Sequence, residues 1–250
     1  MRHRDRPAAA RPGRPGRIIT LQSIGLLPVP RPTAAALLAL VLAAAGAPTW
    51  AAQGTTASPA AGQPASDRVA AEKAATELSR KAATGDAAAL AALTNGAERG
   101  DAPCQFHLAT LYKDGLGVPR DDVLYAAWLI KAADQGHAGA QSRLIGVYEE
   151  GKGVRQDDTL AAQWARRAAD QGELAGQLAL VKDYYFGRGV AKSLVEAIKW
   201  QAILESRGFV AKDDEFTRQM EMAAGVVQAE EGRALAREWL KAASGASRAR

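Results

Sequence analysis

Residues 101–136 read DAPCQFHLATLYKDGLGVPRDDVLYAAWLIKAADQG, and this stretch decides the fold because the chain repeats its pattern twice more without a gap. Residues 137–172 match it at 17 of 36 positions, and residues 173–208 keep the same period. A fixed period of this length is typical of solenoids, in which each repeat buries its apolar face against its neighbours. The positions identical in all three blocks are Gln105/Gln141/Gln177, Leu108/Leu144/Leu180, Tyr112/Tyr148/Tyr184, Gly115/Gly151/Gly187, Gly117/Gly153/Gly189, Val118/Val154/Val190, Trp128/Trp164/Trp200 and Gly136/Gly172/Gly208.

Each block predicts two helices joined by a glycine loop. Leu108 and Tyr112 are four residues apart and therefore share one face of the first helix. That helix should end at Gly115, because glycine readily adopts the left-handed conformation of a helix C-cap. Asp121 is suited to cap the second helix, and Trp128 falls in the middle of it, where a large aromatic side chain can fill the space between neighbouring helices. Each block is therefore expected to be one helical hairpin.

The order Leu-x-x-x-Tyr-x-x-Gly-x-Gly-Val, followed by Asp, Trp and Ala-Ala-Asp-Gln-Gly, resembles the Sel-1-like repeat family over residues 101–208. The resemblance implies an all-α fold similar to tetratricopeptide repeats, a right-handed superhelix of antiparallel helix pairs. The family usually has glycine two residues before the tyrosine, where close packing is expected. Gly146 matches, whereas Thr110 and Lys182 do not, and the third repeat has Leu204-Glu205 in place of the Ala-Ala pair.

The flanks of the repeats are expected to cap the solenoid, because a terminal repeat would otherwise expose its hydrophobic face. Residues 67–100 are predicted to form a shortened N-terminal repeat, and residues 52–66 a disordered linker before it. Residues 209–243 are predicted to form C-terminal capping helices, followed by a disordered tail over residues 244–250. The apolar positions expected to pack in the C-terminal cap are Met222, Val226, Leu235, Trp239 and Leu240.

Residues 1–51 have the three parts of a secretory signal peptide: arginines at the start, an apolar run over residues 34–45, and small residues around Ala51. We expect cleavage after Ala51 and a periplasmic or secreted protein. The apolar run is shorter than the roughly 20 residues of a membrane-spanning helix. No membrane insertion is therefore expected after cleavage, and an uncleaved anchor is the alternative.

The basic charge of the chain belongs to this leader. Seven of the 32 basic residues and one of the 27 acidic residues lie up to Ala51, which leaves 25 basic and 26 acidic residues in the body. A body so close to neutral has no general attraction for phosphate, so no nucleic-acid partner is expected. The lone cysteine, Cys104, excludes an internal disulfide framework and is expected to be a buried helix residue.

The sequence contains few residues suited to catalysis, and no cofactor or metal is expected. Cys104 and His107 could share one helical face, but two ligands do not make a zinc site, and we expect His107 to be an exposed helix position. The glycine loops lie between helices and not between a strand and a helix, so they are turns and not a dinucleotide fingerprint. Some members of the resembled family carry paired cysteines and bind β-lactams, but one cysteine does not support that activity here.

These patterns favour a non-enzymatic scaffold, adaptor or regulator of the cell envelope that binds a protein or peptide on its solenoid surface. Two alternatives stay open: an envelope enzyme or carbohydrate-binding module with an unrecognised site, and a structural or toxin-neutralising envelope protein. The three repeated glutamines could instead be structural. The residues expected to contact the partner are Gln105, His107, Thr110, Gln141, Arg143, Gln177 and Lys182.

Overall fold

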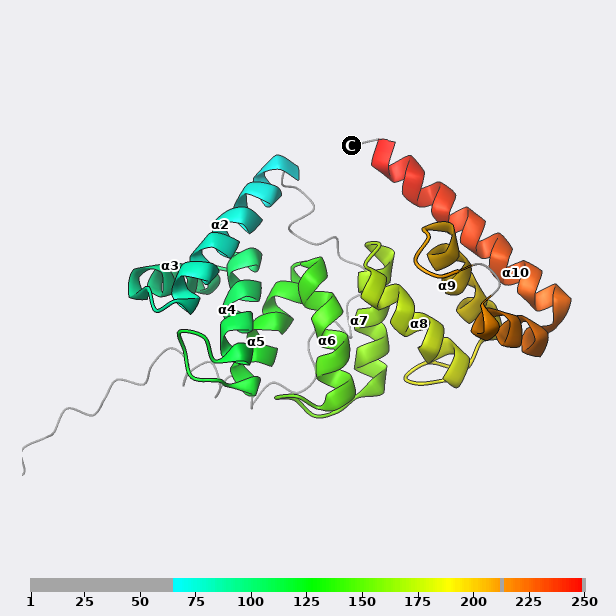
Figure 1. Ribbon diagram of the computed structural model, residues 1–250, viewed down its shortest axis with the longest axis horizontal. Coiled ribbons are helices and arrows are strands. Elements are labelled where there is room, and N and C mark those ends of the chain that lie inside the picture. The colour runs from blue at the N-terminus through cyan, green and yellow to red at the C-terminus, as the bar shows by residue number, and fades with distance from the viewer. Residues whose placement is uncertain (1–64, 212–213, 249–250) are drawn as a thin grey trace, which may run out of the picture.

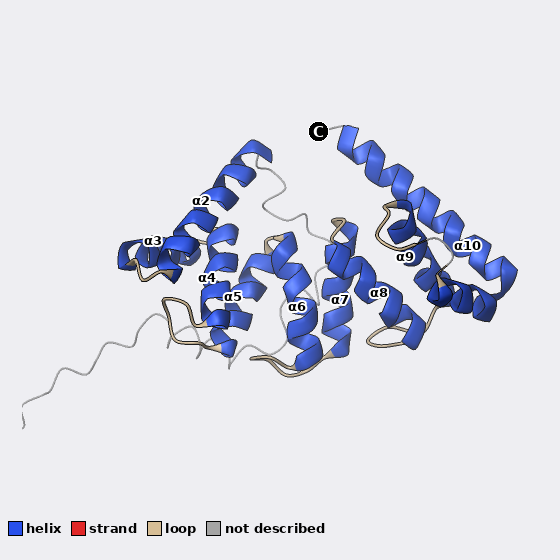
Figure 2. Ribbon diagram, viewed as in Figure 1, coloured by secondary structure: helices blue, strands red, loops and turns tan. Residues whose placement is uncertain are grey.

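The computed structural model describes residues 65–211 and 214–248, and within these ranges the chain forms nine helices and no strand (Figure 1, Figure 2). This confirms the all-α fold. The leader and nearly all of the linker expected at residues 52–66 lie outside the described residues. The helices are α2 (Ala65–Ala83), α3 (Ala87–Glu98), α4 (Ala102–Asp114), α5 (Asp122–Asp134), α6 (Ala138–Glu150), α7 (Asp158–Asp170), α8 (Leu174–Phe186), α9 (Leu194–Ser206) and α10 (Glu215–Arg248).

The helices form antiparallel pairs that stack in chain order along the long axis of the molecule (Figure 1). The pairs α4–α5, α6–α7 and α8–α9 occupy the three sequence repeats, and α2–α3 precedes them. α10 closes the other end of the stack by packing against α9. The first helices of successive pairs also contact one another, α2 against α4 and α6 against α8, so they line a common side of the solenoid, which we call the inner surface.

Local capping explains where the helices begin and end. Asp121 begins α5 by accepting hydrogen bonds from the backbone amides of Val123 and Leu124 through its Oδ1, both at 2.9 Å. α4 ends at Gly115, which has φ 68° and occupies the left-handed C-cap that the sequence predicts. The second glycine of each loop is required for a different reason. A Cβ on Gly153 would overlap the backbone carbonyl of Asp122, so this loop needs glycine to approach the preceding hairpin.

The repeated tryptophans are core residues, as the sequence predicts. Trp128, Trp164 and Trp200 are buried, one in the second helix of each repeat, and they belong to a continuous apolar cluster that runs through the stack. Cys104 is also buried, and a Cβ on Gly96 would come within 2.6 Å of its Sγ. Cys104 therefore fills space between α3 and α4.

One feature expected from the family resemblance has no structural basis here. A Cβ on Gly146 would meet only the flexible Glu150 side chain, at 3.8 Å, so no close helix approach depends on this glycine. The position therefore accepts Thr110 and Lys182 in the other repeats. Close approach occurs at Gly176 instead, whose Cβ would lie 2.6 Å from the backbone nitrogen of Ala169.

The two ends of the helical region differ from expectation. α2 begins at Ala65, two residues inside the expected linker, and α10 continues to Arg248 through much of the tail that was expected to be disordered. Gly225, with φ 77°, divides α10 into two straight parts. Met222 and Val226, next to this kink, are 83% and 87% exposed, so they do not pack in the cap as predicted. Trp239 and Leu240 pack against the core of the repeats as predicted, and the ring centroid of Trp239 lies 5.7 Å from that of Trp200.

A buried glutamine joins each repeat to the one before it. The Nε2 of Gln141 donates to the carbonyl oxygen of Ala133, at the end of α5, over 3.0 Å. The Oε1 of the same side chain accepts from Gln171 Nε2 at 2.7 Å, and Gln171 Nε2 also donates to the Gly136 carbonyl at 3.1 Å. The Ala133 carbonyl also accepts the backbone N–H of Gly136 at 2.9 Å, so Gln141 adds a second hydrogen bond to it, and Gln171 binds the Gly136 carbonyl at the end of the preceding hairpin.

The same bonds recur one period earlier and one period later, and we call the series the glutamine ladder. Gln105 donates to the Ala97 carbonyl at 3.0 Å and accepts from Gln135 at 2.8 Å. In the third repeat Gln177 donates to Ala169, and Arg207 replaces the second glutamine as the donor. Gln105, Gln141 and Gln177 are all buried. The structure therefore corrects the expectation that these glutamines contact a partner: they lie in the core and bind within the chain.

Replacing Gln141 with leucine should lower the free energy of unfolding by about 1–3 kcal/mol, because the buried hydrogen bond to the Ala133 carbonyl is lost and the Gln171 amide loses one of its acceptors. Urea denaturation measures the change. Gln156→Leu, the same substitution at an exposed glutamine, is the matched control and should change stability by less than about 0.5 kcal/mol. Equal effects of the two variants would show that the ladder does not stabilise the stack.

Candidate partner-binding surface

The remaining residues predicted to contact a partner lie along the first helices of the three repeats. His107 and Thr110 are on α4, Arg143 is on α6 and Lys182 is on α8. Thr110 is half-buried, and its hydroxyl donates to the Phe106 carbonyl at 3.1 Å, a bond within its own helix. The structure brings His107 and Arg143 together with residues that the sequence did not single out, whereas Lys182 lies exposed on α8.

The carboxylate of Glu72, on α2, binds two histidines at once. Its Oε1 lies 3.0 Å from His107 Nε2, and its Oε2 lies 3.1 Å from His137 Nε2. Only 14% of the His107 side chain is exposed, which corrects the prediction of an exposed helix position. Burial lowers the pKa of His107 below its usual value, and the nearby Glu72 carboxylate opposes that change. This Glu72 cluster ties α2 to α4 and to the start of α6.

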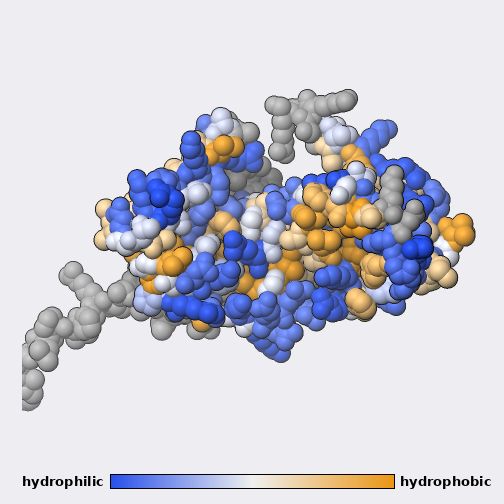
Figure 3. Space-filling view, in the orientation of Figure 1, coloured by the Kyte–Doolittle hydropathy of each residue, from blue (hydrophilic) through white to orange (hydrophobic). Residues whose placement is uncertain are grey.

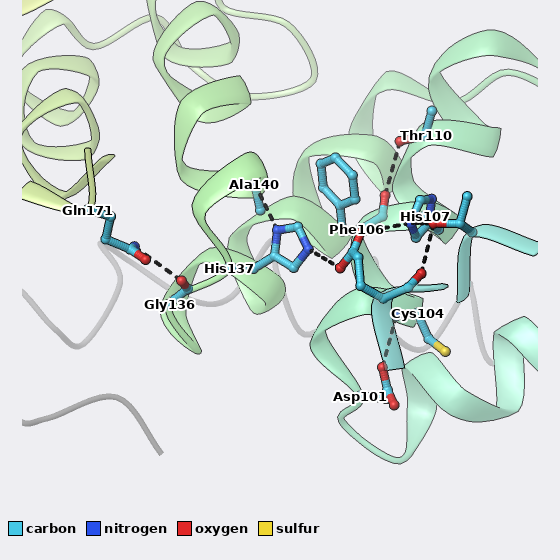
Figure 4. Close-up of polar contacts among 11 residues, drawn as sticks. Asp101, Cys104, Phe106, His107, Thr110, Gly136, His137, Ala140 and Gln171 are labelled. Carbon is cyan, nitrogen blue, oxygen red and sulfur yellow. Dashed lines mark hydrogen bonds and ion pairs between the residues drawn. The ribbon is translucent and has the colours of Figure 1, made fainter. Parts of the chain in front are cut away.

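The hydrogen bonds of His137 determine which of its ring nitrogens carries the proton. Its Nδ1 accepts the backbone N–H of Ala140 at 3.1 Å and so caps α6, which leaves the ring proton on Nε2, facing Glu72 (Figure 4). Neither ring nitrogen of His137 then offers a free lone pair to a metal. Over the residues that the structure describes, no group of three or more histidine, cysteine or acidic side chains is arranged to hold a metal ion.

Cys104 and His107 do not act as a pair, because their side chains have different surroundings. Cys104 contacts Gly96 on α3, whereas His107 contacts Glu72 on α2. Burial, with the nearby Asp101 carboxylate, raises the pKa of the Cys104 thiol to about 12. The thiol is therefore protonated at neutral pH and a poor nucleophile.

Phe106 contacts the rings of both histidines (Figure 4). The guanidinium of Arg143 lies over the Phe106 ring. The Phe106 ring stacks on His137 with a centroid separation of 4.5 Å and an interplanar angle of 23°, and the Arg143 guanidinium lies 5.1 Å from the Phe106 centroid. A Cβ on Gly139 would lie 3.3 Å from His137 Cε1 and 3.4 Å from Phe106 Cζ, so glycine relieves only a slightly close contact with this stack. Phe106 thus holds the cation of Arg143 on the inner surface.

An open groove of about 770 Å³ runs along α2 beside the Glu72 cluster. Arg68 and Lys73 line it together with Glu72 and Glu77. Both acids have partners within the chain: Glu72 binds the two histidines, and Glu77 binds Arg80 at 2.8 Å, which lowers the pKa of Glu77 to about 2. The groove therefore presents two cations whose neighbouring carboxylates are already engaged.

The other end of the inner surface is apolar. Leu178 on α8 is 38% exposed, and Phe209, after α9, is 49% exposed. The spacing of 31 residues between them is that of the contacting pair Phe106 and His137, two periods earlier. Figure 3 shows hydrophobic residues gathered over α8 and α9. The inner surface thus exposes large apolar side chains near α8, next to the exposed Lys182 and to Arg207, whose guanidinium lies 5.0 Å from the centroid of Phe209.

The stacked helix pairs, the glycine loops and one buried tryptophan in each repeat define an all-α solenoid of tandem repeats. A family model described as Sel1 repeat matches the chain at three consecutive places, residues 102–137, 142–173 and 177–200. The chain carries three Sel1 repeats and belongs to that family. Sel1 repeat proteins generally mediate protein–protein interactions, and they are typically not enzymes.

Two solved structures are similar to this chain. A Sel1 repeat protein from Oxalobacter formigenes is 34% identical over 54% of this chain and 97% of its own, with a TM-score of 0.44. A protective antigen present in uropathogenic Escherichia coli strains, which displays an SLR fold, is 25% identical over 70% of this chain, with a TM-score of 0.39. This chain spans 45% of the length of that antigen. Among curated proteins, none matches the chain significantly.

The sequence did not reveal Glu72 or Phe106 as parts of this surface. Glu72 lies in the shortened first hairpin, where no register with the repeats could be set, and Phe106 aligns with Ser142 and Leu178. One signal was present in the sequence. The body has two histidines, His107 in the first helix of the first repeat and His137 at the start of the second repeat, and a shared partner could have been sought for them.

The free energy of unfolding should fall as the pH drops below about 6.5, the usual pKa of histidine. His107 then takes up a proton more readily in the unfolded protein than in the folded protein, where its pKa is lower. His107→Gln keeps a donor for Glu72 but does not titrate, so its unfolding free energy should change less between about pH 7 and 5. Urea denaturation at each pH measures both curves. Parallel curves for the two proteins would contradict the buried state of His107.

Proposed function

We propose that this chain is an exported adaptor that holds a segment of another protein against its inner surface, between α2 and α8. The observation that carries the proposal is the Arg143 guanidinium, held on the Phe106 ring with no carboxylate of the described residues within ion-pair distance. A cation that is fixed on the inner surface and has no acidic partner is suited to binding an acidic group of another protein.

The proposal includes no catalytic step. Glu72, His107 and His137 bind one another, so none of the three is a free general base, and the Cys104 thiol is buried. The repeated polar residues are likewise engaged, because the ladder glutamines bind backbone carbonyls. At one position the three repeats carry His107, Arg143 and Ala179. Positions that differ between repeats in this way determine which side chains the inner surface presents.

Export is part of the proposal because of the leader, which precedes the described residues. Its arginines, apolar run and small residues follow the order of a cleaved signal. None of the described helices combines the length and the apolar composition needed to cross a bilayer. The adaptor would then act in the periplasm or outside the cell.

Expression of the full chain with its own leader in a bacterial host should yield a mature protein that begins at Ala52 and is released with the periplasmic fraction. N-terminal sequencing and osmotic-shock fractionation measure both properties. A protein that keeps residues 1–51 and stays in the membrane fraction would instead support an uncleaved anchor.

Affinity capture from solubilised cell envelopes should recover a protein partner with the wild-type chain and lose it with Arg143→Glu, because the substitution reverses the charge on the inner surface. Arg155→Glu is the matched control: Arg155 is exposed in a loop, away from the Phe106 stack, and its variant should retain the partner. Thermal midpoints of the three proteins verify folding. Recovery of the same proteins with both variants would place binding on another face.

A further inference from the structure

The chemistry of the groove beside α2 indicates what kind of segment it takes. We propose, resting on the adaptor function above, that the part of the inner surface formed by Arg68, Lys73, Phe106 and Arg143 binds an acidic stretch of the partner polypeptide. We call these four residues, three cations and the aromatic ring under Arg143, the basic patch. They come from α2, α4 and α6, and the Glu72 cluster holds those three helices together.

The first argument is a charge imbalance created by internal pairing. Both oxygens of Glu72 accept from histidines, and Glu77 is engaged by Arg80 and Lys81 at 2.8 and 3.6 Å. Within the described ranges, no carboxylate lies within 4.0 Å of the charged nitrogens of Arg68, Lys73 or Arg143. Hydrogen bonds from imidazoles leave the negative charge of Glu72 in place, but the surface has three unpaired cations for that one carboxylate, and Glu77 is balanced by Arg80. An incoming carboxylate therefore meets a positive potential.

The second argument is the geometry of Arg143. Its guanidinium lies over the Phe106 ring, and it also interacts with the hydroxyl of Tyr125. Stacking on an aromatic face leaves the in-plane N–H groups of a guanidinium free for a planar acceptor, and a carboxylate matches that arrangement with two parallel hydrogen bonds. Phe106 is itself fixed by its stack on His137, so Arg143 is oriented before the partner arrives.

The third argument separates an acidic polypeptide from a nucleic acid. A phosphate backbone needs a basic track that continues along the molecule, but at α8 the exposed side chains of Leu178 and Phe209 interrupt the cations. Lys182 and Arg207 are the cations beside them, and Arg207 already donates to Gly172 and Gln177. A polypeptide can match this change, because its acidic residues can lie over α2 to α6 and its apolar residues over α8.

The test measures fluorescence anisotropy of a fluorescein-labelled Glu-Gly repeat peptide with the purified mature chain at low ionic strength. We expect the Glu-Gly peptide to bind and the corresponding Gln-Gly and Lys-Gly peptides not to bind. Arg143→Glu should weaken binding by about tenfold or more, and added salt should weaken binding by the wild type. Arg68→Glu with Lys73→Glu should act in the same direction. The Arg155→Glu control should change the affinity by less than about twofold.

Several outcomes would overturn the acidic occupant: equal binding of the Glu-Gly and Gln-Gly peptides, an equal loss with Arg155→Glu, or displacement of the peptide by oligo-dT at the same charge concentration. Arg143→Lys keeps the charge without the planar fork, and it should retain part of the affinity in a protein with an unchanged thermal midpoint. If the peptide fails to bind while envelope capture still depends on Arg143, the adaptor function stands and the acidic occupant is wrong. If the peptide binds but capture yields no specific partner, the adaptor function fails.

Discussion

The stack depends on how a helical hairpin ends. The last carbonyls of each second helix have no partner in the regular pattern of that helix. In this chain they lie at the junction with the next repeat, where the Ala133 oxygen accepts the backbone N–H of Gly136 and keeps a second lone pair for a side chain. A glutamine side chain from the next repeat binds one of them, and a second polar side chain completes the set, as Gln141 and Gln171 do for Ala133 and Gly136. Because an amide can donate and accept at once, one residue type serves every junction. The apolar cluster supplies the buried apolar area of the stack, and the glutamine ladder determines how each hairpin is placed on the one before.

Much of the fold could be predicted from the sequence because the same physical problem is solved three times in register. Trp128 and its equivalents, the loop glycines and the capping residue Asp121 each have a local reason that recurs every 36 residues. The direction in which Gln105 points has no such local reason. An invariant polar residue on a helix fits a surface or a core equally well, and only the nearness of the Ala97 carbonyl decides between them. Identity at all three glutamine positions, next to positions that vary, was the available hint.

The candidate site was harder to predict because it combines a repeat with a cap. Glu72 comes from α2, which has no counterpart in the repeat pattern, yet its carboxylate determines the position of His107 and His137. Met222 and Val226 show the same limit at the other end, since a kink at Gly225 turns them into solvent. Outside the periodic region, residue type alone did not predict which face of a helix is buried. The terminal helices thus do more than cover an apolar end: α2 also provides one wall of the groove.

The glutamine ladder has a consequence for how such a chain can change its length. Each junction uses only a residue near the start of one hairpin, a residue at its end and two carbonyls of the hairpin before, all in fixed register. A second copy of residues 137–172 inserted in tandem would present Gln141 and Gln171 to the carbonyls of Ala169 and Gly172, which carry the same chemistry as Ala133 and Gly136. Duplication of one gene segment would therefore extend the solenoid by a whole hairpin without a new interface having to evolve, and would move the charged and apolar ends of the binding surface farther apart.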